Sequence, residues 1–275
     1  MANKNLIWIL AVIGAILIFM PQMKKEAIGG EVAYYSFEAQ DAHDDSNNGH
    51  DGTPTNGAAW TSESKVGNYA FQFDGIDDYI SIPDNQDLDI NGTLSLAAWI
   101  YPAVIAGDNR GIINKGQARG TQNQDYRITL NDKGHIEFVC GRGTPGGTEA
   151  GAVTGTVIIN PAEWTHVAAT YEAGIVRIYV NGILDTEGTG FVATPNDMPL
   201  AIGAEFDSLT ATKNWFNGRI DDVRVYNNVL SDTEILELFE YPPTYDYVSF
   251  LNSKDSFLTG GELQYFIDEA NQWII

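Results

Sequence analysis

The feature that most constrains how this chain folds is an alternation of apolar and polar residues with a period of two. It is clearest in three short segments, at residues 78–83, 176–181 and 220–226. Successive side chains of a β-strand point to opposite faces, so each segment predicts a strand with two distinguishable faces. In the last segment Asp221 alternates in step with Val223 and Val225, so the pattern places them on one face.

Tight turns separate the predicted strands. Asn181-Gly182 predicts a two-residue hairpin, because both central positions of such a turn need positive φ. Lys133-Gly134 and Ala173-Gly174 mark two further tight connections. No helical periodicity interrupts residues 32–224, and closely spaced strands without intervening helices predict a β-sandwich.

Two long segments between the strands are polar or rich in glycine, at residues 114–125 and 141–155. Such compositions predict loops rather than strands. Recognition sites of sandwich proteins tend to lie on loops of this kind.

Six sequence blocks follow one another in order along the chain. They are DDSNNGHDG (44–52), AFQFDGIDDYISIP (70–83), LSLAAWIYP (94–102), EWTHVAATYEAGIVRIYVNG (163–182), PLAIG (199–203) and FNGRIDDVRVYNNVLSDTEI (216–235). Together they resemble the laminin-G-like branch of the concanavalin A-like lectin/glucanase superfamily. The resemblance implies an all-β fold, a two-sheet antiparallel jelly-roll sandwich that often carries calcium and often binds carbohydrate. It does not by itself imply catalysis, because function depends on a site.

The chain is strongly acidic, with 37 Asp and Glu against 15 Lys and Arg and a formal net charge of −22. A surface this negative repels phosphate backbones, so the composition argues against a nucleic-acid partner. Divalent cations are better-suited partners. The alternative explanation is that the acidic residues keep an extracellular protein soluble.

Cys140 is the single cysteine, so the chain cannot form an internal disulfide. It ends an alternating run at residues 135–140, which predicts a small residue packed in or beside a strand.

An apolar tract near the N-terminus begins at Leu6, ends at Met20 and contains no charged residue. A helix of this length spans about 22 Å, short of a hydrocarbon core of about 30 Å. It is either a cleaved secretory signal or an uncleaved anchor. The best cleavage pattern, at residues 27–29, follows three charged residues and is poorly placed for processing. We therefore expect a membrane anchor at residues 6–20 with the bulk of the chain on the extracellular face, and secretion after signal cleavage is the alternative.

The chain is expected to divide into three parts: an anchor and tether at residues 1–29, a jelly-roll domain at 30–240 and a C-terminal tail at 241–275. A short helix is expected to close the jelly roll, because Ser231 and Glu234 have the spacing of a capping box.

The tail is expected to contain an amphipathic helix after a second capping box, Thr259 with Glu262. Counted back from Glu262, the tail also resembles a degenerate EF-hand or dockerin-like half. Leu251 stands where the first carboxylate is needed and Ser256 replaces the turn glycine, which favours a metal-free capped helix. The apolar face of this helix suits docking on a partner surface or self-assembly.

A calcium site is the strongest chemical prediction. The segment from Asp44 to Gly52 resembles the D-x-S-G-N-G-N-x-G turn of the family, with Asp44 and Asn48 matching and Asn47 and His50 departing from it. In the family, the Asp of a late G-x-I-D-[DE]-V-R motif lies close to this turn, and here that residue is Asp221. The resemblance thus implies a structural Ca²⁺ bound by Asp44, Asn48 and Asp221 with nearby carbonyls. The alternative is a metal-free Asx-type turn.

Catalysis finds little support. Retaining glycosidases need two carboxylates about 5–5.5 Å apart, which an E-x-D-x-x-E strand supplies in glucanases of this superfamily. Glu205 and Asp207 are the nearest approach, and Thr210 stands where the last Glu is needed. His166, in Trp-x-His-Val, is expected to be packed and satisfied by backbone. We therefore predict that the protein is not an enzyme, with a glycoside hydrolase or polysaccharide lyase as the alternative.

Two aromatic residues are candidates for contact with a sugar. Tyr126 and Trp215 each follow a polar loop, where a ring can stack on a sugar face while neighbouring polar groups bond its hydroxyls. The alternative is that both rings close the ends of the sandwich.

These features predict a membrane-anchored, extracellular module for adhesion that binds a glycan or a cell-surface protein and carries calcium. Two other functions stay open: a structural subunit of a surface layer, filament or envelope, and a polysaccharide-cleaving enzyme.

Overall fold

The computed structural model of the protein describes residues 28–105, 109–116, 124–141, 152–190, 193, 195–208 and 211–240. The apolar tract at residues 6–20 and the predicted helix and EF-hand-like pattern of the tail lie outside them. No helix within the described residues is long and apolar enough to span a membrane.

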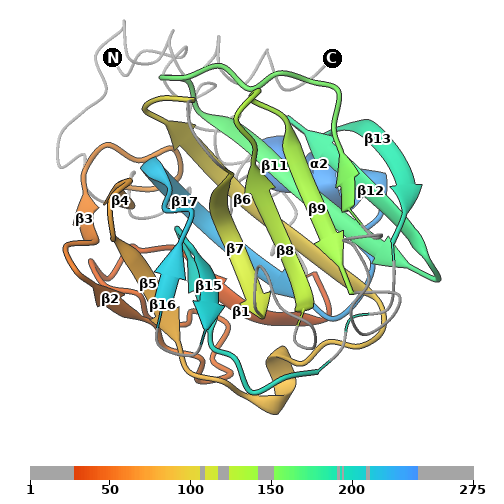
Figure 1. The fold of residues 1–275 in the computed structure, drawn as a ribbon, viewed down its shortest axis with the longest axis horizontal. Helices are drawn as coiled ribbons and strands as arrows, with labels where there is room; N and C mark the ends of the chain where they lie inside the picture. The colour runs from red at the N-terminus through yellow and green to blue at the C-terminus, as the bar shows by residue number, and fades with distance from the viewer. Residues whose placement is uncertain are drawn as a thin grey trace, which may run out of the picture.

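Two antiparallel sheets pack face to face, as the sequence predicts (Figure 1). The first contains β1 (Glu31–Tyr35), β3 (Ala59–Thr61), β4 (Ala70–Asp74), β6 (Leu94–Pro102), β11 (Thr165–Glu172), β12 (Ile175–Val180), β13 (Ile183–Thr189) and β17 (Asn217–Tyr226). Its order in the described part of the chain is β13-β12-β11-β6-β17-β4-β3, with β1 paired to β17.

The second sheet faces the viewer in Figure 1, with β7, β8 and β9 in front. Its members are β2 (Thr53–Thr55), β5 (Tyr79–Ile82), β7 (Arg110–Gly116), β8 (Gln124–Leu130), β9 (Ile136–Cys140), β10 (Ala152–Thr154) and β14 (Leu200–Ile202). They run in the order β10-β9-β8-β7-β14-β5-β2 among the described residues. A small hairpin, β15 (Glu205–Ser208) with β16 (Ala211–Lys213), forms a separate pair.

The core lies between the two sheets and is built by the alternation of each strand. On β6, Leu94, Leu96, Ala98 and Ile100 point into it and are fully or almost fully buried. Each large aliphatic side chain buried in this way contributes about 1.5–3 kcal/mol. Cys140 also packs into this core from β9, which confirms its predicted place.

The predicted alternation of β17 is wrong at one point. Ile220, Val223 and Val225 share the core face, whereas the sequence pattern grouped Asp221 with the two valines. A β-bulge causes the change, since the register against β6 shifts between Asp221 and Arg224. Asp222 has a φ of 48°, the left-handed conformation that such an extra residue can require.

The predicted tight turns are confirmed. Asn181 and Gly182, with φ of 51° and 76°, connect β12 to β13 as a two-residue hairpin. Ala173 and Gly174 have positive φ between β11 and β12. A short 3₁₀ helix, η1 (Gln86–Leu88), which the sequence pattern did not reveal, follows β5.

Helix α2 (Asp232–Glu240) closes the fold and covers the outer face of the eight-stranded sheet. The predicted capping box is confirmed, because Ser231 N donates to Glu234 Oε2 at 2.7 Å and Glu234 N donates to Ser231 Oγ at 3.3 Å. Ile235 and Leu238 pack against Tyr179 and Tyr226 of the sheet.

His166 lies on the outer face of the eight-stranded sheet and is buried, as expected. Its ring packs against Trp99 and Phe239, with centroids 5.3 and 6.3 Å away. The expectation of a backbone partner is not met at Nδ1, which has no hydrogen bond. Burial lowers the pKa of His166 to about 4.

Candidate functional site

The predicted calcium turn folds around Asp44, which is 1% exposed. Its Oδ1 accepts hydrogen bonds from Tyr34 N, Ser46 N and Ser46 Oγ at 3.0, 3.0 and 2.6 Å. Its Oδ2 accepts one bond from His50 N at 3.0 Å. Burial acts to raise the pKa of Asp44, but the bonds from Ser46, His50 and Tyr34 outweigh it and hold the pKa below its usual value.

Asn48 belongs to the same turn and joins it to β1. Its Nδ2 donates to the carbonyl oxygens of Glu31 and Val32 at 3.1 and 2.9 Å. Asn47 reaches the conformation usually reserved for glycine, with a φ of 65°. The departure from the family pattern at this position therefore leaves the turn formed.

Asp221 has partners of its own. Its Oδ2 accepts from Lys65 N and Val66 N, both at 2.8 Å, and its Oδ1 accepts from Asp222 N at 2.8 Å. Burial raises the pKa of Asp221 to about 7, against the opposing effect of these N–H donors.

The three predicted ligands fit calcium unequally. Asp44 Oδ2 and the amide oxygen of Asn48 keep acceptor capacity within one turn, which suits a cation that takes oxygen ligands. The carboxylate of Asp221 faces three backbone N–H groups, whose positive ends oppose a cation. The chemistry of Asp44 and Asn48 thus fits a cation better than that of Asp221 does.

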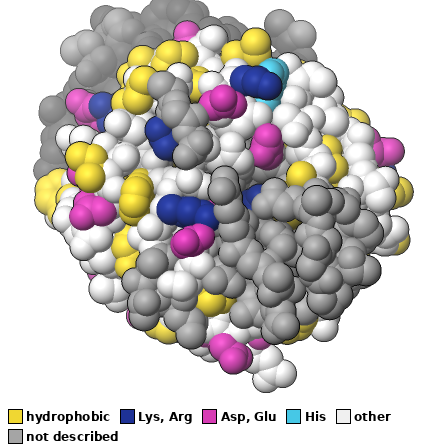
Figure 2. All heavy atoms as spheres, viewed as in Figure 1, with side chains coloured by type: hydrophobic (Ala, Val, Ile, Leu, Met, Phe, Trp, Pro, Cys, Tyr) yellow, Lys and Arg dark blue, Asp and Glu magenta, His cyan; other side chains and the backbone are white. Residues whose placement is uncertain are grey.

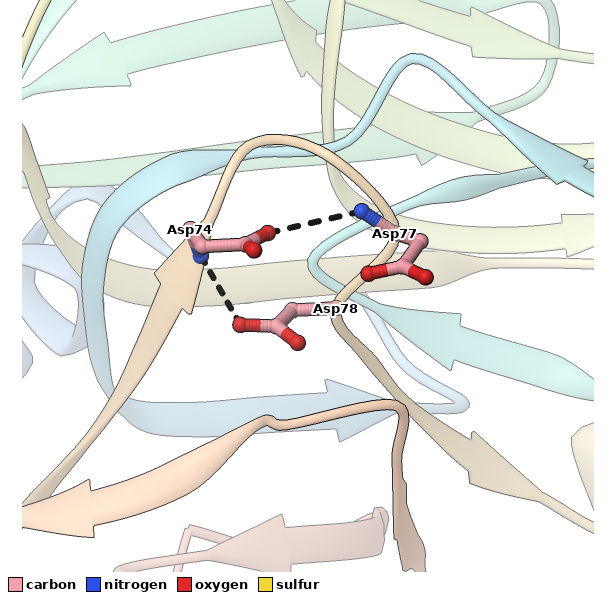
Figure 3. A group of neighbouring side chains, drawn as sticks. All are labelled: Asp74, Asp77 and Asp78. Atoms are coloured by element: carbon pink, nitrogen blue, oxygen red, sulfur yellow. Dashed lines mark hydrogen bonds between the residues drawn. The ribbon is translucent and has the colours of Figure 1, made fainter.

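A second acidic group, which the sequence pattern did not predict, lies in the turn between β4 and β5 (Figure 3). Asp74, Asp77 and Asp78 each offer a carboxylate oxygen within 4.8 Å of the others. Asp74 Oδ1 accepts from Ile76 N at 2.7 Å, and Asp78 Oδ2 accepts from Asp74 N at 2.9 Å. Burial raises the pKa of Asp78, and the negative charges of Asp74 and Asp77 raise it further. The repeated Asp in F-D-G-I-D-D-Y was the available signal.

Tyr126 does not lie where the sugar-binding prediction needs it. It is 1% exposed, packs in the core between the sheets and donates from its hydroxyl to Leu88 O at 3.0 Å. On β8 it shares the inward face with Ile128 and Leu130, which the alternation in Y-R-I-T-L could have shown. Tyr126 is therefore a core residue that ties η1 to the sheet.

Trp215 is half-buried and follows β16. Its indole Nε1 donates to Thr212 Oγ1 at 3.0 Å, which fixes the ring on the hairpin. Lys213 and Asp207 form an ion pair across the same hairpin. The surroundings of Trp215 thus combine a fixed aromatic ring with hydroxyl, amide and charged groups.

The β15–β16 hairpin is held on the outer face of the seven-stranded sheet by polar contacts with β7. Phe206 N donates to Asn114 Oδ1 at 3.0 Å, and Gly111 N donates to Asn214 O at 2.7 Å. A Cβ at Gly111 would lie 2.4 Å from the carbonyl carbon of Ala204, so only glycine permits this approach.

Beneath the hairpin lies a buried charged pair. Glu205 and Arg127 are 2% and 3% exposed, and Glu205 Oε1 lies 3.9 Å from Arg127 Nε. Glu205 Oε2 accepts from Asn214 Nδ2 at 3.1 Å, one residue before Trp215. This layer positions the segment that carries the tryptophan.

The outer face continues as a polar surface toward β9. Glu137 accepts bonds from Asn109 Nδ2 at 3.0 Å and Asn131 Nδ2 at 2.9 Å. Figure 2 shows this side of the molecule, where basic and acidic side chains lie beside one another. A surface of paired charges, amides and hydroxyls suits a neutral, hydroxyl-rich ligand better than a highly charged one.

The two carboxylates nearest to a glucanase pattern are both engaged. Glu205 is buried with Arg127, and Asp207 pairs with Lys213. Each of the two carboxylates therefore lies beside a cationic side chain. Thr210 lies outside the described residues.

Comparisons with known proteins give relatives in sequence and in fold. Over 166 residues the chain is 27% identical to adhesion G-protein coupled receptor V1 of Danio rerio, a match that covers 57% of this chain and 2% of the receptor. The chain thus corresponds to a small part of that protein.

Solved structures share the fold at low identity. The binding domain of paraclostridial mosquitocidal protein 1 has a TM-score of 0.61 and 16% identity, over 76% of this chain and 52% of that one. Domain 4 of AbnA, an extracellular arabinanase from Geobacillus stearothermophilus, has a TM-score of 0.58 and 23% identity, over 76% of this chain and 98% of that one.

A family profile matches the sequence itself. The profile of the concanavalin A-like lectin/glucanases superfamily covers residues 74–236, from the end of β4 into α2. The match spans more than half of the chain, and the two-sheet jelly roll agrees with it, so the chain belongs to the concanavalin A-like lectin/glucanase superfamily.

Proposed function

We propose that this domain is an extracellular binding module that recognises carbohydrate through the surface around Trp215. The observation that carries the proposal is the half-buried indole, held by Thr212 and bordered by the Lys213–Asp207 pair and Asn214. A fixed ring loses little entropy on binding and offers a flat apolar face to a sugar. The polar groups beside it can bond sugar hydroxyls.

Similar proteins support this assignment. The arabinanase domain of the same fold was solved in complex with arabinotriose, and one relative in sequence is an adhesion receptor. The arabinanase is extracellular by name, which supports an extracellular place for this chain. The engaged carboxylates Glu205 and Asp207 favour binding over hydrolysis.

A glycan array followed by calorimetry tests the proposal. We expect one class of neutral oligosaccharide to bind, and Trp215→Ala to weaken binding about tenfold, the loss of roughly one aromatic stacking contact. Trp60→Ala is the matched control, because Trp60 is an exposed tryptophan on β3 of the other sheet and its loss should leave affinity unchanged.

Other results would redirect or overturn the assignment. If no glycan on the array binds but a cell-surface protein does, the partner is a protein and not a carbohydrate. If Trp215→Ala and Trp60→Ala lose the same amount of affinity, the binding site does not lie at the hairpin. New reducing ends or unsaturated products on incubation with glucans or alginate would show an enzyme.

We also propose that a structural Ca²⁺ binds at the Asp44 turn, with Asn48 and nearby carbonyls as further ligands. The remaining acceptor capacity of these two side chains supports it. Calcium should then raise the melting temperature, and Asn48→Ala should abolish the increase. Asp221→Asn should keep it if Asp221 is no ligand. A melting temperature unmoved by chelator, with no calcium uptake in calorimetry, would rule the ion out.

The proposed place of the domain is the outer face of a membrane, held by residues 6–20. The support is the uncharged apolar tract that begins at Leu6 and ends at Met20. Fractionation should recover the full-length chain with membranes until detergent is added. Recovery only of a soluble form beginning near Gly30 would instead show a cleaved signal.

A further inference from the structure

A lysine of the seven-stranded sheet is buried inside the sandwich. Lys115, the penultimate residue of β7, is 0% exposed. It pairs in register with Leu200 on β14 and Tyr126 on β8, both of which face the core. The alternation of β7 thus directs a charged side chain inward, where an unpaired ammonium would be strongly unfavourable.

Four oxygens surround the Lys115 ammonium. Nζ lies 2.6 Å from Asp84 Oδ1, 2.7 Å from Met198 O, 2.9 Å from Asn196 O and 3.0 Å from Asp89 Oδ1. Two carboxylates and two carbonyls are also the kinds of ligand that calcium takes from proteins. We define these four oxygens as the Lys115 cluster.

The Lys115 cluster joins two segments that are far apart in sequence. Asp84 and Asp89 flank η1, which follows β5, while Asn196 and Met198 precede β14. Asn196 N also donates to Asp89 Oδ1 at 3.3 Å, which links the two segments directly. The cation at the centre therefore holds one end of the sandwich together.

We propose that the Lys115 cluster is a cation site built into the fold, in which the Lys115 ammonium stands in for a divalent metal ion. The cluster carries two formal negative charges, so a single ammonium leaves one uncompensated and a divalent ion would balance both. The Asp84 side chain is 33% exposed, so the cluster has a side open to solvent. Removing the ammonium should leave a site that takes Ca²⁺ or a small alkylammonium ion.

The experiment replaces Lys115 by alanine in the full chain and follows thermal unfolding. In chelator, Lys115→Ala should melt roughly 10 °C below the native protein, because it leaves the carboxylates of Asp84 and Asp89 without their cation. Calcium or ethylammonium chloride, each compared with sodium chloride at equal ionic strength, should recover at least half of the loss. Calorimetry should find one calcium site more in the variant than in the native protein.

Two controls separate this site from general charge effects. Lys213→Ala removes the same charge from an exposed ion pair and should gain neither a calcium site nor recovery by ethylammonium. Adding Asp84→Asn and Asp89→Asn to Lys115→Ala should abolish the extra calcium site.

The proposal is overturned if Lys115→Ala melts like the native protein in chelator, or if it gains no calcium site and no recovery from either cation. Should the variant fail to fold in chelator, its refolding yield in calcium and in ethylammonium gives the same readout. No recovery of folded protein in either solution would also refute the cation site.

Discussion

Two buried aspartates, Asp44 and Asp221, show how strongly local partners determine the behaviour of a single residue. The pKa of Asp44 is lowered and that of Asp221 is raised to about 7, although backbone N–H groups donate to both. The side-chain hydroxyl of Ser46 adds a bond to Asp44, whereas the desolvation of Asp221 is larger than its N–H donors can offset.

The raised pKa of Asp221 predicts a pH dependence of stability. In the unfolded chain this carboxyl loses its proton near pH 3.8, but in the folded protein it keeps the proton until about pH 7. Its contribution to stability is therefore fully present below pH 3.8 and is lost as the pH rises to about 7. The loss should be on the order of 4 kcal/mol, at about 1.4 kcal/mol for each pH unit.

Urea unfolding of the native protein and Asp221→Asn at several pH values measures this contribution. Asparagine has nearly the same shape and does not ionise, so the stability of the native protein relative to the variant should fall between pH 4 and pH 7. Titration of His166 occurs in both proteins and cancels in the difference. A difference that stays constant over this range would mean that the carboxyl of Asp221 is already ionised at low pH.

Secondary-structure elements were the part of this protein that the sequence predicted best. Period-two alternation identified β5, β12 and β17, and positive-φ residues such as Asn181 and Gly182 marked the turns, because both signals are local. The bulge at Asp222 escaped prediction, since an extra residue is specified by pairing with β6 rather than by local pattern.

The candidate site was predicted less completely for the same physical reason. Trp215 was found from its place after a polar loop, but its support by Arg127 and Glu205 depends on packing between β8 and β15. For Tyr126 the two local signals disagree: the polar loop before it predicts the surface, whereas its alternation with Ile128 indicates the core. The ring of four oxygens around Lys115 joins segments more than a hundred residues apart, which no local pattern reports.

The capping box of α2 supplies a prediction for one element. Ser231→Ala removes the acceptor for Glu234 N and should cost about 1 kcal/mol of unfolding free energy. Chemical denaturation measures the change, and Ser231→Thr should retain most of the stability because it keeps the hydroxyl. Equal losses in the two variants would show that packing of the serine, rather than capping, stabilises the helix.

The charge of the whole molecule gives a third prediction. With a formal net charge of −22, repulsion between acidic groups opposes the compact state at neutral pH. Sodium chloride raised from a few millimolar to about 0.15 M, where the screening length is about 8 Å, should increase the melting temperature. A melting temperature that falls with salt would mean that surface ion pairs outweigh this repulsion.

The first and last described parts of the domain pack together on one face. Ile28 contacts the same outer cluster as Ile235 and Leu238 of α2, and Asn227 N donates to Gly30 O at 2.8 Å. The chain therefore enters and leaves the sandwich at neighbouring points. This arrangement is typical of a domain that can be inserted into a loop of another protein. A circular permutant that joins residue 240 to residue 28 by a short linker, with new ends in an exposed turn, should retain the jelly roll. Both ends of the described domain therefore lie on the outer face of the eight-stranded sheet, on the opposite side of the sandwich from the β15–β16 hairpin on the seven-stranded sheet.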